Sequence, residues 1–138
     1  GNWSIPEQIN INSNYNIGTA GISADGQTML IFIGGANNTG NLYVIEKDGS
    51  KWTNPVSLGS AINSTYLEST ASLTPDGQTI YFASNRKNGF GGLDIYMSKK
   101  DMNSNWSKPE NLGPLVNTAY DEDAPFIHPD QKTLFFTF

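Results

Sequence analysis

The chain has 138 residues, no cysteine, 14 glycines, a formal net charge of −5 and a charged fraction of 15%. The lack of cysteine excludes disulfides and thiolate metal sites, and the lack of any lysine- or arginine-rich run argues against a nucleic-acid or anionic-membrane surface. The abundant glycine, asparagine, serine and threonine favour a β protein with many turns, and the length allows one domain with a hydrophobic core.

Three internal repeats organise the chain from its start. A Trp-x-x-Pro motif at 3–6 returns at 52–55 and 106–109, so the tryptophans are spaced by 49 and 54 residues. The aspartate of a turn motif recurs at positions 25, 76 and 130, with spacings of 51 and 54. Because two independent markers keep one period, we predict one module over residues 1–138 with repeats at 3–51, 52–105 and 106–138, the last of them incomplete.

Each repeat predicts short strands around a tight turn. In the second repeat, residues 79–83 and 93–97 are β-branched and aromatic, which suits strands. A Pro-Asp-Gly turn precedes the first of these strands. In it, we expect Asp76 to accept hydrogen bonds from nearby backbone and Gly77 to take a positive φ. The third repeat has Gln131 at the glycine position, so we expect Gln131 to take a positive φ.

About fifty residues and four short strands per repeat are what a β-propeller blade requires. The inner strand precedes the Asp turn, the second strand follows it, a third runs through 93–98, and an outer strand starts at the tryptophan. We therefore predict an all-β fold without helices, a β-propeller of four-stranded antiparallel blades. About two and a half blades are present, as a partial propeller or part of a larger ring. The apolar last strand, 133–138, predicts that another segment or a second copy covers its edge.

The second repeat carries the most specific motifs. Residues 74–86 read TPDGQTIYFASNR and residues 91–96 read GGLDIY, which resembles the PD-repeat, a WD-repeat-like propeller repeat of TolB-type proteins. With residues 106–113 and 116–118 added, it is similar to the form found in OmpA-family and PorE-like envelope proteins of Bacteroidetes. The resemblance covers nearly the whole chain, although repeat one lacks the Ser-Asn-Arg and Gly-Gly-x-Asp motifs. It implies a location in the periplasm or at the outer membrane, near peptidoglycan-associated or type IX secretion assemblies.

Meander geometry places three loops on one side of the sheets, which we name face one: residues 63–68, 86–92 and 117–123. Polar and aromatic loops on a rigid scaffold are where binding residues concentrate. Phe90, between two glycines, is the strongest contact candidate, because an aromatic on a polar loop is costly unless something covers it. The sequence allows equally that Phe90 packs under its own loop. The candidate partner-binding residues are Tyr66, Glu68, Arg86, Phe90, Tyr120, Asp121, Glu122 and Asp123.

Several motif residues also have structural interpretations. Trp52 and Trp106 are expected to pack between blades. Asp94, whose slot is filled by Asn41 in repeat one, is expected to accept hydrogen bonds from the neighbouring loop backbone. Arg86 could pair with Asp94 or face a partner, and the sequence leaves both open.

Cofactors and metals are not expected. Asp121, Glu122 and Asp123 together with Glu68 could hold calcium, but no EF-hand pattern is present and acidic loops are usually only solvated.

Catalytic motifs are absent from the sequence. The single histidine, His128, stands at a turn on the side opposite face one, without a nucleophile elbow or a phosphate loop. We therefore predict a non-enzymatic scaffold that binds a protein or peptide partner in the bacterial envelope. The alternative is a carbohydrate-active or peptidase-associated propeller that uses a carboxylate pair from Glu68 and Asp121 to Asp123. That alternative requires these carboxylates to converge in a pocket.

Overall fold

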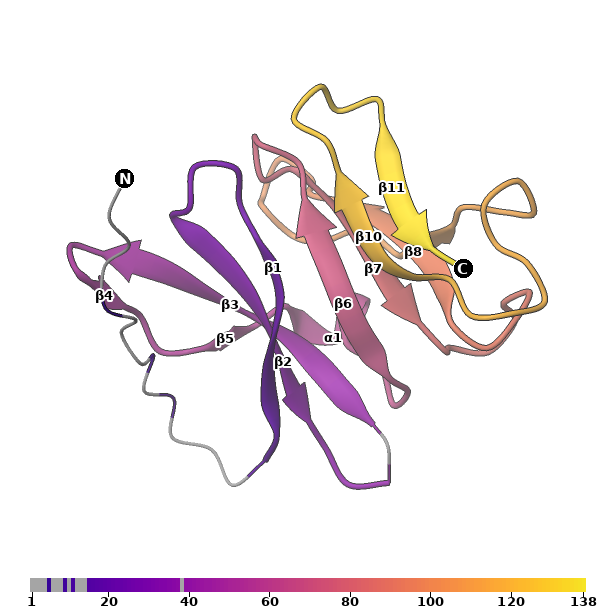
Figure 1. Cartoon of the computed structure of the whole chain (residues 1–138), viewed down its shortest axis with the longest axis horizontal. Coiled ribbons are helices and arrows are strands. Elements are labelled where there is room, and N and C mark those ends of the chain that lie inside the picture. Colours follow the sequence, from indigo (N-terminus) through magenta and orange to yellow (C-terminus); the bar gives the residue numbers. More distant parts are fainter. Residues whose placement is uncertain (1–4, 6–8, 10, 12–14, 38) are drawn as a thin grey trace.

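The computed structural model describes residues 5, 9, 11, 15–37 and 39–138, so the motif at 3–6 and residues 12–14 lie largely outside it. All pairings between its strands are antiparallel, which confirms the all-β prediction. The elements in Figure 1 are β1 (Ile17–Ile22), β2 (Thr28–Gly34), β3 (Gly40–Asp48), β4 (Lys51–Trp52), β5 (Val56–Ser57), α1 (Gly59–Ile62), β6 (Glu68–Leu73), β7 (Thr79–Ser84), β8 (Asp94–Lys99), β9 (Glu110–Asn111), β10 (Asp123–Ile127) and β11 (Leu134–Thr137). The expectation of no helix is wrong at α1, a single turn of 4 residues.

Three sheets follow one another along the chain (Figure 1). The first has the order β1-β2-β3-β4, with β5 also paired to β3; the second is β6-β7-β8-β9, and the third is the β10-β11 hairpin. The outer strands are fragments: β4 and β5 flank Pro55, and Trp106 forms an isolated bridge with Lys100 ahead of Pro109 and β9. Proline has no N–H to give to a strand ladder, which explains these interruptions.

The Asp turns have the predicted geometry in all three sheets. Asp76 accepts hydrogen bonds from the Thr74 hydroxyl (2.6 Å) and the Gln78 backbone N–H (3.0 Å). These bonds, led by the one from Thr74, lower the pKa of Asp76. The residue after each aspartate has a positive φ: 69° at Gly26, 66° at Gly77 and 58° at Gln131. The prediction for Gln131 is therefore confirmed.

Gln131→Gly is expected to raise the free energy of unfolding by about 0.5–1 kcal/mol, because a side chain at positive φ is strained and glycine is not, less the extra freedom of glycine in the unfolded chain. Urea denaturation followed by circular dichroism would measure this gain. The neighbouring substitution Lys132→Gly is the control and should destabilise. A Gln131→Gly variant that is no more stable than the wild type would contradict the strain.

A hydrophobic core joins the first two sheets. It is built from Leu30 and Leu42 of the first sheet and Ile80 and Phe82 of the second, and Trp106 packs against it as predicted. The sheets also approach closely: a Cβ at Gly21 of β1 would collide with the Ala71 carbonyl of β6.

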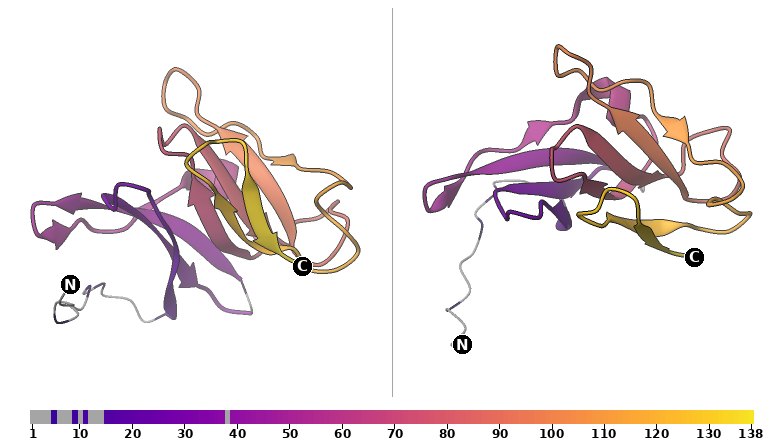
Figure 2. Two further views of the ribbon diagram at one scale, coloured as in Figure 1. Left: turned by 45° about the horizontal axis from the view of Figure 1, so that its top comes forward. Right: turned by 90° about the horizontal axis from the view of Figure 1, so that it is seen from above.

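The hairpin joins the second sheet through its first strand. The Ile127 N–H of β10 donates to the Ser72 hydroxyl of β6 at 3.1 Å. Figure 2 shows the hairpin against the second sheet in two further views. The edge of β11 that faces away from β10 has no strand partner among the described residues. Phe135 within β11 and Phe138 just after it are exposed.

Candidate functional site

The structure brings the second and third loops of face one together. The Gly92 N–H donates to the Tyr120 carbonyl (3.0 Å), and the Glu122 N–H donates to the Leu93 carbonyl (2.8 Å). A Cβ at Gly91 would collide with the Tyr120 carbonyl oxygen, so this contact requires glycine there. Phe90 and Tyr120 therefore lie on two loops that are hydrogen-bonded to each other, and the two residues are 51% and 78% exposed.

Asp94 holds the loop that carries Phe90. Its carboxylate is buried and accepts the Phe90 N–H (2.7 Å), the Gly91 N–H (3.2 Å) and the Asn111 side-chain amide (3.1 Å). A buried carboxylate is stable only with such donors, and the predicted role of Asp94 is confirmed. The shorter loop of repeat one does not reproduce this network, and the buried Asn41 Oδ1 there has no hydrogen-bond partner among the described residues.

Glu68 is fully buried and fastens the first loop of face one. It accepts the Ser64 hydroxyl (2.6 Å) and backbone N–H (2.9 Å), the Ser84 hydroxyl (3.0 Å), and Arg86 Nη2 (3.1 Å). The suggested ion pair between Arg86 and Asp94 is wrong, because the Arg86 guanidinium forms its ion pair with Glu68 instead.

Arg86 connects three parts of the fold. Its Nη2 also donates to the Ile62 carbonyl (2.7 Å), and its guanidinium carbon lies 4.9 Å from the ring centroids of both Phe82 and Tyr96. With its side chain 15% exposed, Arg86 offers little surface to a partner. Arg86 and Glu68 therefore form an internal ion pair. Tyr66, on the same loop as Glu68, is half-buried.

The acidic residues of the third loop also bond to the protein itself. Glu122, at the position equivalent to Glu68, is fully buried and accepts the backbone N–H (2.8 Å) and the hydroxyl of Thr118. Asp121 is exposed and accepts the Leu93 N–H (2.8 Å). Asp123 accepts hydroxyl hydrogen bonds from β6, one of them from Ser69 at 3.1 Å.

These carboxylates are therefore distributed over separate hydrogen-bond networks. In the part of the chain that the structure describes, no three or more histidine, cysteine, aspartate or glutamate side chains form a group that could hold a metal ion. Two cavities lie beside Trp106 and Trp52, and neither has Glu68 or residues 121–123 in its lining. The convergence that the carbohydrate-active alternative requires is not found at either cavity.

His128 lies apart from face one, in the third Asp turn. Its Nδ1 is 3.3 Å from a carboxylate oxygen of Asp130. Hydrogen bonds from the Lys132 and Thr133 backbone lower the pKa of Asp130 to about 2, with the Thr133 hydroxyl and His128 adding to the effect. All of these contacts join residues 128–133 and stabilise the third Asp turn.

Two asparagines that sequence reasoning left without a role fasten face one to the sheets. The Asn63 side chain accepts the Leu42 N–H and donates to the Leu42 carbonyl, both at 2.9 Å. Asn117 makes the same pair of bonds to Ile95, at 2.8 and 2.9 Å. Each amide thus pairs with one residue of a third strand as a neighbouring strand would. The available signal was the recurrence of asparagine at this repeat position.

No protein-family model matches the chain, and no curated protein matches it. None of the helices among the described residues is long and apolar enough to cross a membrane.

Proposed function

We propose that the chain is a β-propeller module that binds a protein or peptide partner through face one and carries out no catalysis. Three successive antiparallel sheets, each built around an equivalent Asp turn, support the propeller. Rings use about four to eight such blades, so the chain is a partial propeller or part of a larger ring. The sequence resemblance to TolB-type and PorE-like repeats supports a place in the bacterial envelope, in the periplasm or at the outer membrane.

The observation that carries the binding proposal is the exposed pair Phe90 and Tyr120 on two loops that are bonded to each other. Aromatic side chains supply much of the energy of protein interfaces, and a fixed loop loses little entropy on binding. The nearby buried acids, Glu68 and Glu122, are occupied by internal hydrogen bonds, which favours binding over acid–base chemistry.

A peptide selection tests this proposal. Peptides selected on the wild-type protein from a random displayed library should lose affinity at least about tenfold on Phe90→Ala and on Tyr120→Ala, because truncating a central aromatic contact commonly costs more than 1.4 kcal/mol. The control is Met102→Ala, which truncates an even more exposed apolar residue outside face one. Selected peptides that bind Phe90→Ala and Tyr120→Ala with the wild-type affinity would refute the site. Turnover of glycans or peptides that disappears in Glu68→Gln would refute the absence of catalysis.

The same proposal includes self-association through β11, because its outer edge is unpaired and flanked by exposed phenylalanines. Light scattering over a concentration series measures the molar mass. A monomer at every concentration would contradict self-association and leave the face-one proposal standing.

A further inference from the structure

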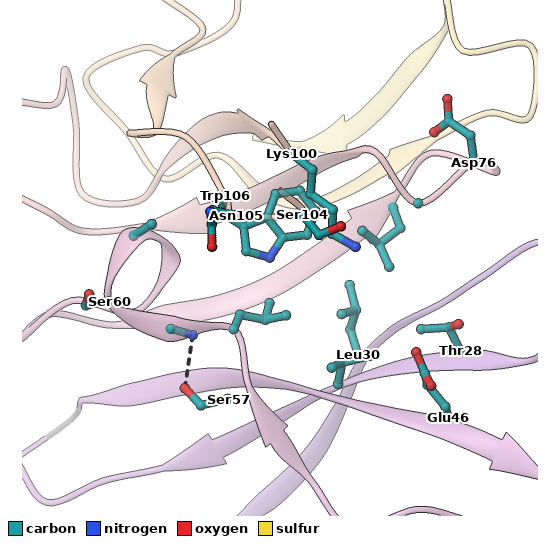
Figure 3. Close-up of a pocket in the computed structure, with 16 residues that line it drawn as sticks. Thr28, Leu30, Glu46, Ser57, Ser60, Asp76, Lys100, Ser104, Asn105 and Trp106 are labelled. Atoms are coloured by element: carbon teal, nitrogen blue, oxygen red, sulfur yellow. Dashed lines mark hydrogen bonds between the residues drawn. The ribbon is translucent and has the colours of Figure 1, made fainter. Parts of the chain in front are cut away.

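A groove of about 580 Å³ lies between the first two sheets, beside the second Asp turn (Figure 3). None of its lining residues belongs to face one. Its floor is apolar and continues the shared core through Leu30, Val44, Leu58, Leu73 and Trp106. A volume of this size, with an apolar floor and a few polar groups at the rim, is typical of ligand sites.

The rim of this groove carries two carboxylates from opposite sheets. Figure 3 shows Glu46 of β3 and Asp76 of the turn at the same end. Glu46 is exposed, and its carboxylate makes no hydrogen bond or ion pair with other described residues. The hydrogen bonds on Asp76 lower its pKa and keep it charged. The one lysine of the lining, Lys100, holds its ammonium over the Trp106 ring at 4.9 Å.

The neighbouring repeat provides an internal comparison. A cavity of about 800 Å³ lies beside Trp52, which pairs in register with Lys47 as Trp106 bridges with Lys100. The described lining of that cavity includes Lys47 and Lys51 and no carboxylate. The two cavities each have a tryptophan and its paired lysine, and among the described lining residues only the first cavity has carboxylates.

We propose that this groove binds an extended peptide segment in which a large apolar residue stands beside an arginine or lysine. The apolar side chain packs on Trp106 and Leu73, and the basic side chain extends along the groove to Glu46 and Asp76. Long basic side chains suit such a place, because their stems pack on apolar surface while the charge stays at the rim. The site uses none of the residues of face one.

The test follows the indole N–H resonance of Trp106 by NMR, assigned with Trp106→Phe. The probes are acetyl-Gly-Leu-Arg-Gly-amide and the same peptide with glutamate in place of arginine. The arginine peptide should shift this resonance in a saturable manner, and the glutamate peptide should not. Glu46→Gln should weaken binding about two- to fivefold, as expected for one exposed ion pair, and Glu46→Lys should weaken it further.

Glu110→Gln is the matched control, since it removes the same charge from an exposed residue outside the groove. It should leave the affinity unchanged, and so should Phe90→Ala, which separates this site from face one. The proposal is overturned if the arginine peptide leaves the Trp106 resonance unmoved, if both peptides bind equally, or if Glu46→Lys binds the arginine peptide as the wild type does.

Discussion

Arg86→Met is expected to lower the free energy of unfolding by about 3–5 kcal/mol, because it leaves the fully buried Glu68 carboxylate without its cation. Methionine keeps an apolar stem in place of the arginine but loses the hydrogen bond to the Ile62 carbonyl and the contact with two aromatic rings. Chemical denaturation of the two proteins side by side measures the difference.

Two further variants identify the cause of that loss. Lys87→Met removes an exposed positive charge from the adjacent residue and should change stability by less than about 0.5 kcal/mol. The double variant Arg86→Met, Glu68→Gln should recover part of the loss, because the buried charge has then been removed as well. A double variant no more stable than Arg86→Met would show that packing around the arginine, and not its charge, supports the loop.

This arrangement separates the two kinds of residue on face one. Glu68, Arg86 and Glu122 are charged residues, which a sequence suggests are exposed, but they form hydrogen bonds within the protein that fix the loops. Phe90 and Tyr120 are aromatic residues, which are usually buried, but in this structure they are exposed. A partner bound as proposed would contact these aromatic side chains, and substitutions of the buried ion pair are expected to alter binding only through stability.

The features that could be predicted from sequence are those determined by a few adjacent residues. The positive φ of Gln131 follows from its place after Asp130 in the turn. The hydrogen bonds that the Phe90 and Gly91 N–H groups donate to Asp94 span at most four residues. Local chemistry of this kind has few alternatives, so a single sequence is enough.

The features that were not predictable depend on contacts between distant segments. The donors to Glu68 come from Ser64, Ser84 and Arg86, and nothing in their spacing distinguishes a buried acid from a solvated one. Helix α1 is too short to produce a periodic pattern. The groove under Trp106 exists only because the first sheet lies against the second.

Asn117→Ala is expected to lower the free energy of unfolding by about 1–3 kcal/mol, because it leaves the N–H of the fully buried Ile95 without its partner. It also removes one of the two donors to the Ile95 carbonyl, the other being the Leu112 N–H. The same substitution also removes the bond from the Asn117 amide to Asn111, at 2.8 Å. Thermal and urea denaturation measure the loss. Asn103→Ala, in an exposed loop, is the control and should be close to neutral.

Asn117→Asp separates the two halves of this contact. The aspartate can still accept the Ile95 N–H, but it cannot donate to the Ile95 carbonyl and it brings a charge into a buried site. It should therefore be no more stable than Asn117→Ala. If aspartate is tolerated as well as asparagine, the amide is not pairing with the strand. If neither alanine nor aspartate is tolerated at position 117, the result supports the interpretation that the asparagine recurs because its side chain pairs with the third strand in place of a neighbouring strand.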